Sequence, residues 1–336
     1  MMTTSLKAMS ESLKKSTSNA CENLLTAEEQ QEKINELRRL VGPLPDKLSC
    51  YCSDALISRH LRAWNWNINK ATKMLKENLK WRLEYKPEEI RWDEVACEAE
   101  TGKIYRSNYV DKHGRTVLVM RPSCQNSKST SAQIRYLVYC MENAILNLPQ
   151  NQEQMIWLID FHGFNLSNIS FKVSRETAHV LQVHYPERLG DAILYNPPKF
   201  FEPFYRLVKP FLEQKTANKV KFVYSDDPNT KKIMEDLFDI EQLDSAFGGK
   251  DNTGFDIHKY AERMREDDKR MASLVAAHRP VLTTDTCSNP TNSVSDSDAS
   301  DEKVDKSSHG VNVEDFSPEN DLPVPSGCSK PAGDAK

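Results

Sequence analysis

The chain has 336 residues, of which 38% are hydrophobic, and its formal net charge is -4 at pH 7. This length and apolar fraction allow one large domain or two smaller ones, with a core in only part of the chain. The slightly acidic balance gives no overall basic field, so we expect no nucleic-acid partner. Apolar runs such as 155–159 are far shorter than a bilayer span, and the N-terminal sequence lacks the apolar region of a secretory signal. These features indicate a cytoplasmic protein.

The eight cysteines are scattered along the chain, and only Cys50 and Cys52 lie close together. Zinc sites commonly draw on two such pairs, so an isolated C-x-C pair is more often incidental than metal-binding. We therefore expect reduced thiols in a reducing compartment and no bound metal.

The first part of the chain has the pattern of a polar tail followed by helices. Residues 1–25 are rich in Ser, Thr, Lys and Asn, which predicts disorder. Thr26 and Glu29 form a capping-box pattern that begins a helix. Two more amphipathic helices are predicted before Pro87. The sequence therefore predicts a three-helix N-lobe over 26–100.

Beyond residue 100, strand-like runs alternate with helical patterns. Strands are predicted at 104–110, 116–120, 155–160, 192–195 and 220–224, and helices at 131–148, 174–184, 230–237 and 240–247. Helix-length crossovers between strands imply a mostly parallel sheet with right-handed connections. The fold class is α/β, with an α/β domain over 101–255. A charged segment at 256–278 is predicted to form an exposed helix, and 279–336 an acidic, Ser-rich disordered tail.

An aromatic segment interrupted by prolines connects the last two predicted strands. Its apolar residues recur at offsets of one, three and four, so on a helix they form one broad face. Such a face usually packs in the core, but Pro203 and Pro210 make a stiff, kinked segment that is unusual for a plain crossover helix. We therefore predict a movable apolar lid formed by Phe200, Phe201, Phe204, Tyr205, Val208, Phe211 and Leu212.

The common motifs of nucleotide binding and serine hydrolysis do not occur. The sequence contains no G-x-S-x-G, G-x-x-x-x-G-K-[ST] or G-x-G-x-x-G pattern. His162, His179 and His184 invite an acid/base or metal interpretation with Asp160, but no H-E-x-x-H spacing supports it. Ordinary surface or loop histidines are the simpler interpretation. We predict no catalytic residues and no cofactor, while an α/β enzyme of an unrecognised type stays open.

Several sequence blocks occur in an order that resembles a known family. They are HLRAWNWNINKATKMLKENLKWR, HYPERL, YNPPKFFEPFYRLVKPFL, LEQKTANKVKF and the final FGG. Over about residues 50–250 the chain is similar to the CRAL-TRIO lipid-binding family, in particular to its phosphatidylinositol-transfer branch. The resemblance implies a sheet that floors an apolar cavity for the acyl chains of one lipid, with the aromatic helix as its gate at a membrane surface.

The resemblance also implies a function in lipid transport. The expected ligand is phosphatidylinositol, carried or presented by a monomer that contacts membranes transiently and peripherally. Two alternatives remain. One is a carrier of another hydrophobic molecule, such as a tocopherol or a sterol, and the other is the α/β enzyme mentioned above.

The resemblance further implies where the lipid headgroup binds. In phosphatidylinositol-binding members, a Glu of the P-E-R block and a Thr and a Lys of the T-x-x-K block reach the inositol phosphate, and these positions match Glu187, Thr216 and Lys219. Lys219 would supply a charge for the phosphodiester, Thr216 a hydroxyl, and Glu187 an acceptor for inositol hydroxyls. Arg62, the remaining arginine of the family's R-A-R block because Trp64 replaces the second one, is also expected at the lipid headgroup.

Family members that also bind phosphatidylcholine hold it with two tyrosines and a Ser/Thr pair. By motif position these residues fall at Ser107, Leu118, Met155 and Trp157, which we expect to line the cavity. Most of the phosphate donors are therefore absent, and an unpaired buried polar group costs on the order of 1 to 3 kcal/mol, more if it is charged. We predict measurable phosphatidylinositol transfer with little phosphatidylcholine transfer.

Overall fold

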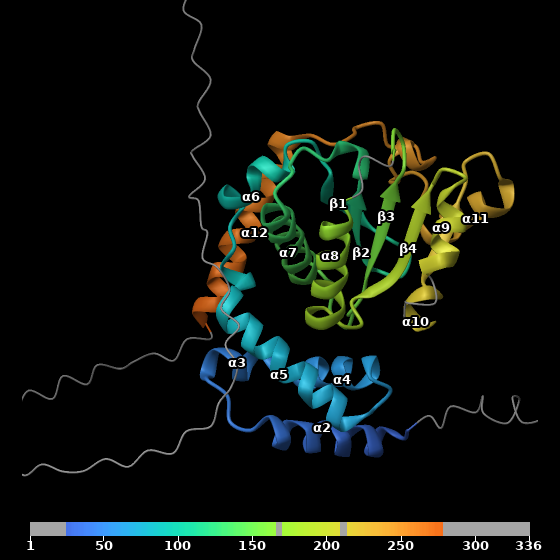
Figure 1. The fold of residues 1–336 in the computed structure, drawn as a ribbon. Coiled ribbons are helices and arrows are strands. Elements are labelled where there is room, and N and C mark those ends of the chain that lie inside the picture. Colours follow the sequence, from blue (N-terminus) through green and yellow to red (C-terminus); the bar gives the residue numbers. More distant parts are fainter. Residues whose placement is uncertain (1–24, 166–169, 209–213, 278–336) are drawn as a thin grey trace, which may run out of the picture. The chain divides into compact units, whose positions relative to one another are not determined.

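The computed structural model describes residues 25–165, 170–208 and 214–277, drawn as the coloured ribbon in Figure 1. The chain divides into two units, Met1–Leu282 and Thr283–Lys336, and all described residues belong to the first. Nearly all of the predicted disordered N-terminus and the whole predicted tail lie outside the described residues.

The N-terminal helices form a lobe with a hydrophobic cluster of its own. They are α2 (Ala27–Val41), α3 (Asp46–Tyr51), α4 (Asp54–Ala63) and α5 (Ile68–Tyr85). The predicted capping box is present, because the Thr26 hydroxyl accepts from the Glu29 N–H and the Glu29 carboxylate accepts from the Thr26 N–H. The short helix α3 adds to the predicted helices. Residues at the centre of the cluster include Leu37, Ile57, Leu61 and Leu75.

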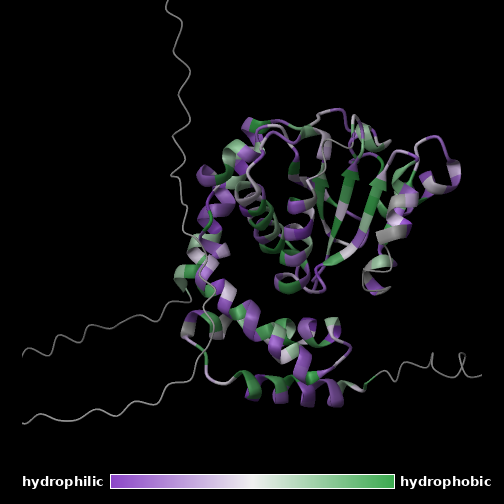
Figure 2. Ribbon diagram, in the orientation of Figure 1, coloured by the Kyte–Doolittle hydropathy of each residue, from purple (hydrophilic) through white to green (hydrophobic). Residues whose placement is uncertain are grey.

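A five-stranded sheet in the order β1-β2-β3-β4-β5 organises the remainder of this unit (Figure 1). Its strands are β1 (Ile104–Val110), β2 (Thr116–Met120), β3 (Met155–Asp160), β4 (Leu189–Tyr195) and β5 (Val220–Val223). β1 and β2 are antiparallel, and the other neighbouring pairs are parallel. Figure 2 shows the inner strands as mainly hydrophobic, as expected of strands covered on both faces. The predicted α/β class with a mostly parallel sheet is confirmed.

Helices connect the parallel strands. The connections are α7 (Thr130–Leu146) after β2, α8 (Phe171–His184) after β3, and α9 (Phe201–Val208) with α10 (Gln214–Ala217) after β4. Figure 1 shows α7 and α8 side by side on one face of the sheet. The helix α11 (Pro228–Leu237) follows β5 and packs on it. The aromatic segment thus contains a helix, as its apolar periodicity predicts.

Short elements complete the unit. They are the 3-10 turns η1 (Pro87–Glu89), η2 (Pro122–Cys124) and η5 (Ser245–Phe247), and the helix α6 (Trp92–Ala99). The predicted helix at 240–247 is wrong, since only the single turn η5 forms there. The Asp244 carboxylate accepts from the Ala246 N–H at 2.9 Å, and Gly248 takes a left-handed φ of 83°. These local bonds favour a tight turn over a longer helix.

The charged segment forms α12 (Ile257–Ala277), most of whose residues are exposed as expected, but one side of the helix is buried. Tyr260, Met264 and Asp267 are buried. The Tyr260 hydroxyl accepts a hydrogen bond from the Arg106 backbone N–H at 3.1 Å, and Asp267 accepts from the Arg106 guanidinium at 2.7 Å. α12 therefore covers part of the edge strand β1, where free backbone groups could otherwise pair with another chain.

Candidate functional site

A cavity of about 590 Å³ lies among the helical lobe, the sheet and α8. The helical lobe contributes Ala63, Trp64 and Met74, and β3 contributes Trp157. Most of the lining is apolar, with polar groups concentrated at a few positions. A cavity of this size and character suits a hydrophobic ligand with a polar end.

One wall of the cavity is the helix α8, which contributes Val173, Ser174, Thr177, Ala178, Leu181, Gln182 and Val183. The residues Val173, Thr177 and Leu181 follow one another at a spacing of four and therefore share one face of the helix. Ser174 and Ala178 are small, which leaves room beside this face. Sequence reasoning missed this wall, although the spacing and the small side chains were visible.

The polar edge of the cavity contains Glu187, Arg188 and Lys219. The Lys219 ammonium lies 3.6 Å from a Glu187 carboxylate oxygen, and the two side chains are 22% and 18% exposed. Glu187 has a φ of 59°, in the left-handed region that residues other than glycine rarely adopt. The fold thus brings together two of the four residues that the sequence places at the headgroup. Thr216 belongs to α10, but its side chain lies outside the described part of the chain.

Arg62 has a different partner. Its guanidinium lies 2.5 Å from one carboxylate oxygen of Glu153, and that of Arg59 lies 2.6 Å from the other. Burial opposes the ionisation of Glu153, but the two arginines outweigh it and lower the pKa of this carboxyl. Arg62 therefore ties α4 to the segment that precedes β3. Its part in headgroup binding stays a prediction.

A buried charge network lies beside the cavity. Arg82 of α5 donates to both carboxylate oxygens of Glu142 in α7, at 2.8 and 3.1 Å. The hydroxyl of Tyr185, which lines the cavity, donates to Glu142 at 2.8 Å. Burial disfavours the charged carboxylate, yet the charge and hydrogen bonds of Arg82 lower the pKa of Glu142. This network fixes α5 against α7 at the cavity wall.

The four residues that the sequence assigns to the cavity lining occupy different places. Trp157 lines the cavity, and its buried indole N–H has no acceptor among the described residues. Met155 and Leu118 are fully buried in the larger hydrophobic cluster and are not part of this lining. Ser107 lines a second pocket, where its hydroxyl donates to the Tyr109 carbonyl at 2.6 Å.

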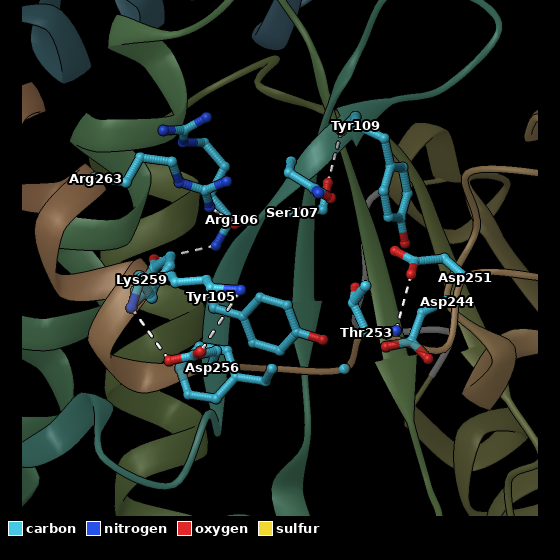
Figure 3. A pocket seen from close by; sticks show the side chains of 14 residues that line it. Tyr105, Arg106, Ser107, Tyr109, Asp244, Asp251, Thr253, Asp256, Lys259 and Arg263 are labelled. Carbon is cyan, nitrogen blue, oxygen red and sulfur yellow. Dashed lines mark hydrogen bonds and ion pairs between the residues drawn. The ribbon is translucent and has the colours of Figure 1, made fainter.

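Figure 3 shows this second pocket, of about 370 Å³, beside the edge strand β1. Arg106 and Lys259 lie on one side of it, and Asp244 and Asp251 lie on the other. Acyl chains would have to desolvate these charges, so the second pocket is unsuited to hydrocarbon. The first cavity is therefore the candidate lipid site.

The structure describes only some residues of the predicted gate. Phe200 is 45% exposed. The Phe201 ring packs on Phe161, with ring centroids 4.8 Å apart, and Tyr205 packs on Phe222 at 5.4 Å. The side chains of Phe204 and Val208, and residues Phe211 and Leu212 as a whole, lie outside the described residues.

Two of the histidines considered above, His184 and His162, make ordinary packing or backbone contacts. His184 stacks on Trp81 with ring centroids 3.9 Å apart, and burial lowers the pKa of its imidazole to about 3. The backbone N–H of His162 donates to the Asp160 carboxylate at 2.9 Å. Among the described residues, no group of three His, Cys, Asp or Glu side chains could hold a metal ion. None of the described helices combines the length and hydrophobicity that a membrane crossing needs.

Comparison with known proteins matches the sequence of this chain to one family. The family model described as CRAL/TRIO domain matches residues 99–249. The phosphatidylinositol transfer protein PDR17 of Saccharomyces cerevisiae is 33% identical over 220 residues, which cover 62% of this chain and 60% of the relative. The CRAL-TRIO domain-containing protein YKL091C of the same yeast is 30% identical over 246 residues, which cover 66% of this chain and 78% of the relative.

A solved structure agrees with the fold. The crystal structure of Sfh5 aligns with a TM-score of 0.56 and 17% sequence identity, covering 76% of this chain and 99% of that one. At this identity the likeness concerns the fold alone. The chain spans between 20% and 62% of the length of three of the relatives that it matches, PDR17 among them, which is less than two thirds of each.

Proposed function

The chain belongs to the CRAL-TRIO family, and from this premise we propose that it binds phosphatidylinositol and carries it between membranes or presents it at a membrane surface. The main support is the 590 Å³ cavity, whose apolar lining ends at the pair Glu187 and Lys219. An apolar cavity that ends at one carboxylate and one ammonium group suits a lipid whose headgroup contains a phosphodiester and a sugar.

The two ends of the lipid would bind by different forces. Burial of acyl chains removes apolar surface from water at roughly 0.8 kcal/mol per CH₂, and a membrane offers the same burial. Exchange between protein and membrane is then nearly balanced in free energy. At the headgroup, Lys219 pairs with the phosphodiester, Glu187 accepts from inositol hydroxyls, and Thr216 adds a hydroxyl.

The aromatic helix would act as the gate at the membrane. Phe200 is exposed, and Arg206 on the same segment is exposed as well, so aromatic and cationic groups are available to a bilayer with anionic lipids. The protein would therefore act in the cytoplasm, with transient contact to membranes. The remaining gate residues belong to this proposal on the strength of the sequence.

A carrier of a less polar molecule is the second candidate. It is favoured by Trp157, Met141 and Met74, which add an aromatic ring and two thioethers to the cavity lining. A sterol- or tocopherol-like ligand would use these contacts without a phosphate contact.

One experiment separates these functions. The full chain is purified, its bound molecules are identified by mass spectrometry, and its transfer of labelled phosphatidylinositol between vesicles is measured. Copurified phosphatidylinositol together with transfer would support the proposal. Copurification of a sterol or tocopherol without phosphatidylinositol transfer would support the second candidate. An empty cavity with turnover of a water-soluble substrate would point to an enzyme and overturn both.

A further inference from the structure

Lys215 is a cation beside the cavity that the sequence did not single out. Its ammonium donates to the Asn65 side-chain oxygen at 2.7 Å and approaches the Arg62 carbonyl oxygen at 3.5 Å. Both acceptors are neutral, and no carboxylate of the described residues lies within ion-pair distance of Lys215. An ammonium has three N–H donors, so at least one remains for another acceptor.

Lys215 contacts residues that are neighbours in sequence of the cavity lining. Its two acceptors belong to the residues that flank Ala63 and Trp64, which line the cavity. In the chain it stands four residues before Lys219, which also lines the cavity. Lys215 is thus held beside the cavity wall at Ala63 and Trp64, and the chain reaches the polar edge four residues later at Lys219.

The turn that holds Lys215 is well defined. Asn65 and Trp66 have φ values of 49° and 60°, and the Trp66 N–H donates to the Leu61 carbonyl at 2.7 Å. Asparagine is among the residues that tolerate the left-handed region best. The Asn65 oxygen is therefore presented at a fixed place between α4 and α5, and it restricts where the Lys215 ammonium can lie.

The balance of charge at this edge favours an anionic ligand. Arg188 lines the cavity, donates to the Glu153 backbone carbonyl at 2.9 Å and has no carboxylate within ion-pair distance among the described residues. Lys219 shares the edge with one carboxylate, that of Glu187. With Lys215, three cationic groups stand against a single acid, so positive charge remains uncompensated.

We propose that Lys215 is a further headgroup residue, which exchanges its neutral acceptors for the phosphate of the bound lipid and so favours anionic over zwitterionic or neutral ligands. This inference rests on the proposed function. The chemistry required is a phosphate ester, which a bound lipid headgroup or the anionic surface of a membrane could each present, and we assign Lys215 to the bound headgroup.

The test compares three variants of the full chain with the wild type. Lys215→Met removes the charge and keeps the length of the side chain. Lys232→Met removes an exposed lysine of α11 as a matched control for net charge. Asn65→Lys is added to Lys215→Met because a lysine at 65 can return an ammonium to the same place. The chain already holds a lysine in the left-handed region, since Lys86 has a φ of 52°.

Two measurements are made, namely transfer of phosphatidylinositol between vesicles and calorimetric binding of a water-soluble, short-chain phosphatidylinositol without membranes. We expect Lys215→Met to weaken both by about three- to tenfold, the range for loss of one partly exposed charge-assisted contact. Lys232→Met should leave both unchanged, and the Asn65→Lys, Lys215→Met double variant should recover most of the loss. Recovery by a charge placed in the turn between α4 and α5 would not follow if Lys215 only stabilised the fold through Asn65.

Three outcomes would overturn the inference. Unchanged binding and transfer in Lys215→Met would remove Lys215 from the site. A loss confined to transfer, with membrane-free binding unchanged, would assign Lys215 to the membrane surface. Failure of the double variant to recover would indicate a structural role, provided that its thermal transition matches that of Lys215→Met. If the wild type itself neither binds nor transfers phosphatidylinositol, the proposed function fails together with this inference. That result is distinguishable from the three above because it is seen without any variant.

Discussion

Replacement of Glu142 by Gln is expected to destabilise the unit that contains the cavity. Glu142 and Arg82 have side chains that are 10% and 6% exposed, and they form two hydrogen bonds. Removing one partner of a buried ion pair leaves an uncompensated charge and costs about 3–5 kcal/mol. Arg82 keeps a second carboxylate, because Glu88 lies 3.2 Å away. We therefore expect the free energy of unfolding to fall by about 3 kcal/mol, the lower end of this range.

The assay is thermal and urea unfolding at pH 7. For a domain of this size, a loss of 3 kcal/mol lowers Tm by about 6–12 °C. Glu84→Gln is the matched control, because Glu84 is 66% exposed and lies 3.8 Å from Lys80 on the surface of α5. Such a surface pair contributes little, so the control should change Tm only slightly. A loss below about 1 kcal/mol in Glu142→Gln would show that the network does not hold α5 against α7.

The cost of Glu142→Gln should depend on pH. The pKa of Glu142 is lower in the folded protein than its usual value of 4.5. Its carboxylate therefore contributes stability above that value, and the contribution is lost as the pH falls through the folded-state pKa. The difference between wild type and variant should accordingly be full at pH 7 and shrink in strongly acidic buffer. A difference that grows on acidification would refute this account.

Other predictions concern the ligand and the gate. Lys219→Ala should abolish phosphatidylinositol transfer between vesicles. It should leave Tm nearly unchanged, because the Lys219 side chain is 22% exposed at the cavity edge. Unchanged transfer would remove Lys219 from the headgroup site. Phe204→Asp should weaken vesicle cosedimentation without unfolding the protein, and an unfolded variant would place this residue in the core. In a transfer assay the wild type should move phosphatidylinositol far better than phosphatidylcholine, and equal transfer of both lipids would refute this selectivity.

Local sequence determined most of the secondary structure. The five strands consist mostly of β-branched, aromatic or other apolar residues, and the crossovers between the parallel strands have the length of helices, so a mostly parallel sheet follows from connectivity alone. The capping box of Thr26 and Glu29 is a contact between neighbours, which any chain with this sequence can make. The family resemblance also assigned Glu187, Thr216 and Lys219 to one site, and the side chains of Glu187 and Lys219 do lie together.

Tertiary structure decided which residues line the cavity. Alternation along a strand predicts that Met155 and Trp157 share one face of the sheet, and register places Leu118 beside Trp157. Packing then separates them, because Met155 and Leu118 are fully buried in the larger core, whereas Trp157 remains at the cavity. The positions of α7 and α8 on the sheet depend on contacts between side chains that are far apart in the chain. No local sequence pattern specifies these contacts.

The same limit applies to charged residues. Arg62 is expected at the headgroup from the sequence, and only the fold shows that Glu153, far along the chain, pairs with it. Asp267 looked like one of many surface charges on a solvated helix, yet it is buried against Arg106 and Asn143. Sequence by itself establishes which side chains can carry charge, and only the fold decides which opposite charge each one meets, because ion pairs form across distances that the chain closes only when it folds.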